Sequence, residues 1–258
     1  MVNTPNTLDK LGWPDLACLF GAREMFKRNR LIVGAAAALV VVAGGIAAVV
    51  LLNSHHAPGS FALTSPTPAG VQGTLAGSWK VASGSEAGYR VREKFINQPG
   101  PTEAVARTTK VTGSLKVASG SGSALTATSI HFTIDLTALT SQDKYATFQT
   151  YQRDFFIRQI YLQTAEFPTA DFTATSVTLP TDITAGPVTV TTSGSLKVHG
   201  VTKNVTTQLQ AQLNGNEIEV AGSISVDMRD FNVEVPDISF TKAEPGVIIE
   251  YHLLLARG

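Results

Sequence analysis

The side chains that could carry catalysis or bind a metal are scattered along this sequence. His131, His199 and His252 each stand alone in a stretch where apolar and polar residues alternate. A zinc site needs several ligands in fixed geometry, and the sequence has neither an H-E-x-x-H pattern nor paired His/Cys spacing. It also lacks a G-x-S-x-G nucleophile elbow, and its only cysteine is Cys18. We therefore expect no metal site and no catalytic residue.

Two small groups of opposite charges remain. Arg153 and Asp154 are adjacent in a segment with helical spacing, and a second group lies between Asp227 and Asp230. Catalytic pairs need close approach and shifted pKa values, which a sequence does not reveal. We interpret Arg153 or Asp154 as fixing a helix against a sheet through an ion pair or hydrogen bonds.

The overall charge argues against one class of partner. Lys and Arg number 20 and Asp and Glu number 20, so the net charge is zero. Nucleic-acid binders carry a basic surface, and nothing here resembles one. The residues after Cys18 contain no cysteine, so this part of the chain is held together by burial and not by disulfides.

One apolar segment organises the chain. Residues 31–52 carry no charge, and at ~1.5 Å rise per residue they reach about 33 Å, enough to cross a bilayer core. Basic residues cluster between Arg23 and Arg30, and the next one is Lys80. Because positive charge stays on the cytoplasmic side, the N-terminus is expected inside. A cleaved signal peptide is the alternative, but its apolar core is shorter, ~7–15 residues.

The chain therefore divides into four predicted regions. They are a cytoplasmic tail at 1–30, an uncleaved single-pass transmembrane helix at 31–52, a flexible linker at 53–75 and an extracytoplasmic domain at 76–258. The linker prediction rests on the many Pro, Gly, Ser and Thr residues and the absence of charge in that region.

Alternation of apolar and polar residues dominates the last region and predicts strands with one buried face. It covers residues 89–95, 109–117, 129–136, 171–179, 188–198, 201–213, 217–228 and 247–255. Gly215 predicts a hairpin turn between Leu213 and Glu217. Many closely spaced strands indicate an all-β antiparallel sandwich or barrel. The apolar strand faces fit either a solid core or a hollow barrel around a ligand.

Residues Asp143 to Leu162 break this alternation. They lack Gly and Pro, and their apolar residues recur at spacings of three and four, which indicates a helix. Ser141 precedes them as the expected N-cap. The helix is expected to lie over a barrel opening or beside one sheet.

Two motifs resemble the YceI family of bacterial polyisoprenoid-binding, lipocalin-like proteins. Residues 153–172 are similar to the family pattern R-D-x-x-L followed by F/Y-P-x-x-F, with Ile157 at the Leu position. Residues 194–205 are similar to its strand pair G-x-L-x-x-x-G-V-T-K-x-V. The resemblance covers Ser78 to Arg257. The motif positions, for which a structural role is preferred, are Arg153, Asp154, Phe167, Pro168, Gly194, Gly200, Val201 and Thr202.

The resemblance implies an eight-stranded antiparallel barrel with a helical segment beside it and a long apolar tunnel. Such a tunnel accepts a chain lipid, an isoprenoid quinone or a polyprenyl derivative, as a ligand and not as a cofactor. Burial of CH₂ groups, at ~0.8 kcal/mol each, supplies the affinity. The insertion at 96–104 is longer than is typical of the family, and we expect it to reshape the tunnel mouth. Whether the protein forms a homodimer stays open.

Strand alternation and the helix face predict which side chains line the tunnel. They are Phe132, Ile134, Phe148, Phe155, Phe156, Phe172, Leu196, Ile224, Val226, Phe231, Ile249 and Tyr251. The expected function is a membrane-anchored, extracytoplasmic lipid-binding protein that is not an enzyme. The alternatives are a cell-envelope protein-interaction module with a collapsed tunnel, and an enzyme that acts on a bound lipid through Arg153, Asp154 or His199.

Overall fold

The computed structural model describes residues 55–65, 75–96, 98–119, 125–145, 150–180, 183 and 185–258. The predicted tail at 1–30 and the predicted membrane span at 31–52 lie outside these residues. Within the part of the chain that the structure describes, no helix is long and apolar enough to span a membrane.

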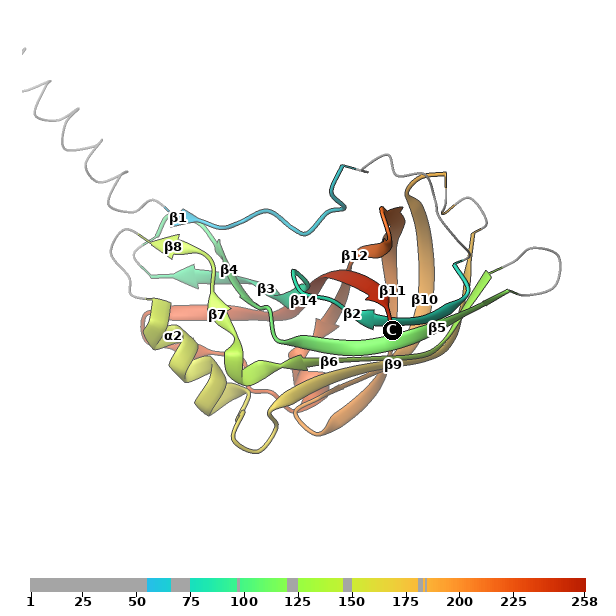
Figure 1. Cartoon of the computed structure of the whole chain (residues 1–258). Helices are drawn as coiled ribbons and strands as arrows, with labels where there is room; N and C mark the ends of the chain where they lie inside the picture. Colours follow the sequence, from blue (N-terminus) through green and yellow to red (C-terminus); the bar gives the residue numbers. More distant parts are fainter. Residues whose placement is uncertain are drawn as a thin grey trace, which may run out of the picture. The chain divides into compact units, whose positions relative to one another are not determined.

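Eight antiparallel strands close into a barrel, as predicted (Figure 1). The ring runs β14-β12-β11-β10-β9-β6-β5-β2 and returns to β14, and each neighbouring pair is antiparallel. In chain order these strands are β2 (Gly77–Val81), β5 (Val111–Ser119), β6 (Leu125–Asp135), β9 (Thr169–Leu179), β10 (Val188–Val198), β11 (Val201–Asn214), β12 (Glu217–Asp227) and β14 (Thr241–Arg257). Gly215, at φ 63°, forms the predicted hairpin turn between β11 and β12.

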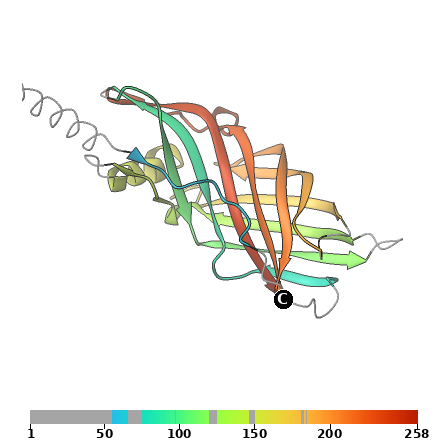
Figure 2. The same ribbon diagram turned by 90° about the horizontal axis from the view of Figure 1, so that it is seen from above.

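The long strand β14 joins the ring to an extension of the sheet (Figure 2). Residues 255–257 of β14 pair with β2, whereas residues 241–252 pair with β3 (Glu86–Phe95). The other neighbour of β3 is β4 (Thr102–Thr108), which pairs in turn with β7 (Thr140–Ser141). β3, β4 and β7 therefore extend the sheet from β14 and lie outside the closed ring. The short strand β13 (Asp237–Ile238) pairs with the start of β14.

Strand β4 was not predicted, because it shows no alternation. Ala104, Val105 and Ala106 are all buried, so both faces of the strand are covered. At the edge of β4 beside β7, the N–H of Val105 donates to Asp143 Oδ1 at 3.0 Å, and the N–H of Gln142 donates to the Val105 carbonyl at 2.8 Å. Alternation marks strands with one wet face, which β4 lacks.

The helix is shorter than predicted. It consists of α2 (Thr150–Phe156) and a π-helical turn, η3 (Ile157–Tyr161). Two short 3-10 turns lie elsewhere in the chain, η2 (Leu136–Ala138) after β6 and η5 (Met228–Phe231) after β12. Asp143 instead precedes β8 (Lys144–Tyr145), which pairs with β1 (His55–His56). The N-cap prediction for Ser141 is wrong, since this residue lies in β7 and its N–H donates to both carboxylate oxygens of Asp154 at 3.1 Å.

Residues 55–65, which we call the strap, lie against the outer face of the barrel. The guanidinium of Arg90 donates to the Pro58 carbonyl at 2.7 Å, and that of Arg107 donates to the Gly59 carbonyl at 2.6 Å. The Arg107 guanidinium also lies 3.9 Å from the centre of the Phe61 ring. The prediction of a flexible linker over 53–75 is therefore wrong for residues 55–65. Residues 53–54 and 66–74 lie outside the described part of the chain.

Glu219 on β12 holds the end of the strap. Its carboxylate accepts hydrogen bonds from the N–H and the hydroxyl of Thr64 at 2.8 and 2.9 Å and from Gln212 Nε2 at 2.7 Å. His252 Nε2 lies 2.7 Å from the same carboxylate. Burial raises the pKa of Glu219, but the hydrogen bonds from His252, Thr64 and Gln212 outweigh it and lower the pKa to about 2.

The Glu219→Gln variant is therefore expected to be less stable and to release the strap. Because the folded pKa lies below the ordinary value of 4.5, the ionised carboxylate stabilises the fold fully above that pH, and the stabilisation is lost as the pH falls toward about 2. At pH 7 the variant should lose roughly 3 kcal/mol of unfolding free energy. Urea titrations between pH 2 and 7 measure this loss. Glu217→Gln, on the same strand, is the control, and an equal acid dependence in both variants would contradict the assignment.

Candidate ligand-binding cavity

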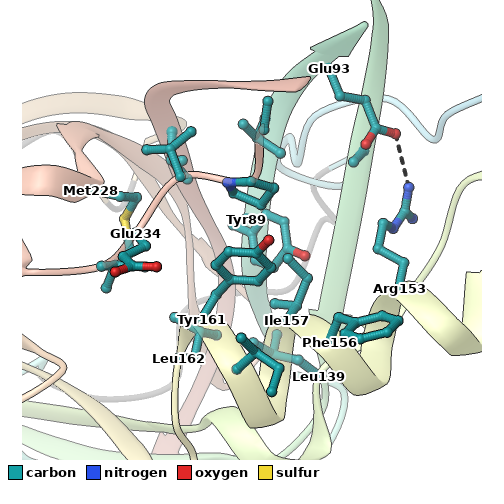
Figure 3. Close-up of a pocket in the computed structure, with 18 of the residues that line it drawn as sticks. Tyr89, Glu93, Leu139, Arg153, Phe156, Ile157, Tyr161, Leu162, Met228 and Glu234 are labelled. Atoms are coloured by element: carbon teal, nitrogen blue, oxygen red, sulfur yellow. Dashed lines mark hydrogen bonds and ion pairs between the residues drawn. The ribbon is translucent and has the colours of Figure 1, made fainter. Parts of the chain in front are cut away.

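The larger of the two described cavities lies under the helix and beside the closed ring. It encloses about 510 Å³ between β3, β4, the start of β14, the α2–η3 helix and the segment that follows η5 (Figure 3). It forms here because β3 and β4 extend the sheet beyond the ring, and the helix covers the space beside this extension. Its apolar lining includes Val91, Phe95, Ala104, Leu139, Phe156, Ile157, Ile160, Tyr161, Leu162, Met228, Val233, Val235, Ile238, Phe240, Ala243 and Val247.

The smaller cavity, of about 120 Å³, lies inside the ring. Most of the ring interior is therefore filled with packed side chains. Ile134, Ala170 and Ile249 line both cavities, so the two spaces are neighbours. The hydroxyl of Tyr251 in the smaller cavity lies 2.8 Å from that of Thr207, and burial raises the pKa of Tyr251 to about 12.

A buried ion-pair cluster, made of Arg153, Glu93 and Asp143, lies at one wall of the larger cavity, which Arg153 and Glu93 line. Arg153 reaches from α2 toward Glu93 on β3, with 3.0 Å between Nη1 and Oε1 (Figure 3). The same guanidinium also pairs with Asp143 and donates to the Ser141 hydroxyl at 2.6 Å. Together with the contact between Asp154 and Ser141, these bonds join the helix to β3 and β7.

Tyr89, next to the cluster, also lines the larger cavity. Burial raises the pKa of its phenol above the usual value, and the charge of Arg153 opposes this only in part. The phenol therefore stays protonated at neutral pH. Across the cavity, Met228 and Glu234 lie on the side opposite Phe156 and Arg153 (Figure 3).

Eight of the twelve predicted lining residues border one of the cavities. Phe156 borders the larger one, Ile134 and Ile249 border both, and the smaller one is bordered by Phe132, Phe172, Leu196, Ile224 and Tyr251. That these residues contact a ligand stays a prediction. The prediction missed most of the larger cavity. Tyr89, Val91, Glu93 and Phe95 alternate along β3 and all line it, so the alternation over residues 89–95 was an available signal that the prediction did not use. β4 and residues 233–240 show no such periodicity.

The other four predicted residues lie elsewhere. Val226 and Phe231 pack in an apolar cluster with Leu196 and Val198 and border neither cavity. Phe155 is 56% exposed, because it precedes Phe156 on the helix and so points away from the cavity. The prediction that these three line a tunnel is therefore wrong for both described cavities. Phe148 lies outside the described residues.

The two sequence motifs meet in space. His199 and Gly200, at φ 49° and 75°, form the tight turn between β10 and β11. Phe167 of the first motif packs on this turn, with 4.4 Å between the ring centres of Phe167 and His199. A Cβ at Gly200 would lie 2.9 Å from the Phe167 ring, so only glycine fits there. The Pro168 carbonyl accepts the N–H of Leu136 at 2.8 Å.

The rest of the second motif lies in the β10–β11 ladder, at Gly194, Val201 and Thr202. In this ladder Val201 is opposite Val198, and Thr202 is opposite Lys197. A Cβ at Gly194 would lie 2.5 Å from the Phe172 ring, so glycine makes room for that ring beside the smaller cavity. The motif positions outside the helix therefore have a packing role in this fold.

Solved structures of three bacterial proteins show similarity to this chain. A polyisoprenoid binding domain from Saccharophagus degradans implicated in plant cell wall breakdown is 17% identical, with a TM-score of 0.49 over 71% of this chain and 99% of that chain. Burkholderia cenocepacia BcnA is 20% identical, with a TM-score of 0.43 over 64% of this chain and 95% of that chain. A Campylobacter jejuni YceI protein is 11% identical, with a TM-score of 0.37 over 76% of this chain and 93% of that chain. Among curated proteins, none matches. The family described as YceI-like domain matches residues 83–253, and because this is more than half of the chain, the protein belongs to the YceI-like family.

Proposed function

We propose that this protein binds a long-chain isoprenoid-type lipid, such as an isoprenoid quinone or a polyprenyl derivative, and stores, transports or shields it. The observation that carries the proposal is the preformed apolar cavity of about 510 Å³ beside the barrel. Its volume lies within the range of small-molecule sites, roughly 300–1,000 Å³. Membership in the YceI-like family supports the same class of ligand.

The size of the two cavities limits how much of the lipid is enclosed. At roughly 30 Å³ for a group the size of a water molecule, 510 Å³ holds about 17 methylene-sized groups. The neighbouring 120 Å³ holds about four more on the same measure. Together they enclose about four isoprene units, and a longer tail extends through the mouth. At ~0.8 kcal/mol per CH₂, burial alone supplies ample affinity.

The polar groups of the cavity favour binding over catalysis. Arg153 is engaged with Glu93 and Asp143, and Tyr89 stays protonated because burial raises its pKa. The ion pairs of Arg153 position the helix, and a phenol with a raised pKa is a poor general base at neutral pH. We therefore propose a binding protein and not an enzyme.

We also propose that residues 31–52 anchor the protein in the cell membrane as a single span, with the N-terminus in the cytoplasm and the barrel outside. The apolar run and the basic residues on its N-terminal side support this orientation. A lipid tail of this kind is insoluble in water, so a shielded site next to the membrane suits its storage or transfer.

Native mass spectrometry of the full-length protein, purified from its own host and followed by solvent extraction, tests the proposed ligand. The expected result is a bound species whose extracted mass belongs to a polyprenyl series. A clean apo mass, together with no uptake of added isoprenoid quinone, would overturn the lipid-binding proposal and favour a protein-interaction module.

A further inference from the structure

Large apolar side chains gather around the mouth of the larger cavity. Six of them are between 45% and 73% exposed, and they form what we call the mouth rim: Ile96, Phe155, Phe156, Ile160, Ile238 and Phe240. They come from three segments, namely the residue that follows β3, the α2–η3 helix, and β13 with the turn that leads to β14. The N–H of Ile96 donates to the Phe240 carbonyl at 3.0 Å, which joins two of these segments.

Ligand binding in the cavity accounts for only part of this rim. Phe156, Ile160, Ile238 and Phe240 line the cavity, whereas Ile96 and Phe155 line neither cavity and point toward water. Contiguous exposed apolar surface of this kind marks a site of contact with a membrane or a protein. The two outward residues therefore need a partner other than the bound lipid.

The start of the strap lies close to the rim. His55 Nε2 lies 3.5 Å from Asp143 Oδ2, and Asp143 pairs with Arg153 of α2, the helix that carries Phe155 and Phe156. In Figure 1, β1, β8 and α2 gather at the same end of the barrel. The apolar run ends at Leu52, three residues before His55. Three residues span at most about 11 Å, so the connection between the apolar run and the strap is short.

We propose that the mouth rim inserts into the surface of the lipid bilayer in which residues 31–52 are anchored. This inference rests on the proposed membrane anchor and extends it, because it states which face of the barrel meets the membrane. The cavity then opens directly into the apolar part of the bilayer, and a lipid enters or leaves without crossing water. The strap, held by Arg90, Arg107 and Glu219, keeps the anchor at this end.

Depth-dependent fluorescence quenching tests the proposal on the full-length protein. A Cys18→Ser background with Ile96→Cys carries an environment-sensitive dye and is reconstituted in phosphatidylcholine–phosphatidylglycerol vesicles that contain acyl-brominated lipid. The control is Asn216→Cys in the same background. Asn216 follows Gly215 in the hairpin between β11 and β12. This hairpin lies at the other end of the barrel, because the start of β12 pairs with Leu255, near the end of β14, whereas the rim lies near the start of β14. The dye at Ile96 should be quenched, and the dye at Asn216 should not.

The outcomes separate this proposal from the proposed function. Protein that floats with the vesicles and carries isoprenoid lipid, but whose Ile96 dye is not quenched, overturns rim insertion and leaves lipid binding intact. Protein that does not float with the vesicles overturns both the anchor and rim insertion. Protein that inserts its rim but takes up no isoprenoid overturns lipid binding alone.

A transfer assay adds a readout that does not depend on a dye at the rim. The double variant Ile96→Asp, Phe155→Asp should pass a fluorescent isoprenoid quinone to vesicles about tenfold more slowly or worse, because charged side chains do not enter the apolar layer. The fraction of loaded protein should not change, since neither residue lines a cavity. Ile248→Asp, an exposed apolar position on the outer face of β14, is the matched control. Equal transfer rates in all three proteins would overturn the proposal.

Discussion

The Val247→Trp variant is expected to bind an isoprenoid quinone about 1,000-fold more weakly than the unaltered protein, or worse. Val247 lines the larger cavity and belongs to none of the apolar clusters found among the described residues, so its enlargement should spare the fold. Tryptophan adds about seven non-hydrogen atoms, which displace a similar number of CH₂ groups at ~0.8 kcal/mol each, or about 5 kcal/mol. Native mass spectrometry with increasing quinone concentration measures the change in Kd.

The adjacent residue supplies the control for this experiment. Ile248 also lies on β14, but its side chain is 40% exposed on the outer face. The Ile248→Trp variant adds the same bulk to the same strand outside the cavity, and its Kd should stay within about twofold of the unaltered protein. If both variants lost affinity equally, the binding site would not be the cavity under the helix.

Strand alternation predicted seven of the eight ring strands, because one face of each of these strands is largely buried and the other is largely wet. The exception is β2 (Gly77–Val81), which has only five residues. β10 was predicted at its observed bounds, Val188–Val198. β14 was predicted only from Val247 onward, although it begins at Thr241. The missing part contains Pro245 and Gly246, and the pairing of β14 with β3 shifts register between Ala243 and Val247. A bulge of this kind breaks the period of two on which the prediction depends.

The cavity could be predicted only in part, for a related reason. Alternation shows which side chains point into the ring. Phe132 and Phe172, both predicted as lining residues, are opposite each other in the β6–β9 ladder and border the smaller cavity. The larger cavity lies beside the ring, at the place where β3 turns to pair with β4. Its position depends on contacts between segments far apart in sequence, such as the pair Arg153–Glu93. Local periodicity carries no signal for such contacts.

The strap escaped prediction because its stabilising partners lie in other parts of the chain. Its Pro, Gly, Ser and Thr content is typical of a linker. The side chains that bind it are Arg90, Arg107 and Glu219, each on a strand of the sheet. The available signal was the position of these charged residues on the outer face of the sheet. Charges that are buried there need polar partners, which another segment of the chain must supply.

The Arg153→Met variant is expected to lose about 3–5 kcal/mol of unfolding free energy. The side chains of Glu93 and Asp143 are 6% and 0% exposed, and removal of the cation leaves both carboxylates buried beside an apolar group. The loss should detach the helix that covers the larger cavity. Urea titration of the full-length protein, followed by the fluorescence of Trp79 in a Trp13→Phe background, measures the unfolding free energy.

Arg229→Met separates the effect of burial from the effect of losing an ion pair. Arg229 pairs with Asp227, but the two side chains are 67% and 32% exposed, so this variant should lose less than about 1 kcal/mol. A large loss in Arg153→Met beside a small one in Arg229→Met would assign Arg153 to the attachment of the helix. If Arg153→Met instead kept its unfolding free energy and lost affinity for isoprenoid quinone, the guanidinium would act on the ligand, and the family's Arg-Asp pair would mark a binding residue at the cavity wall.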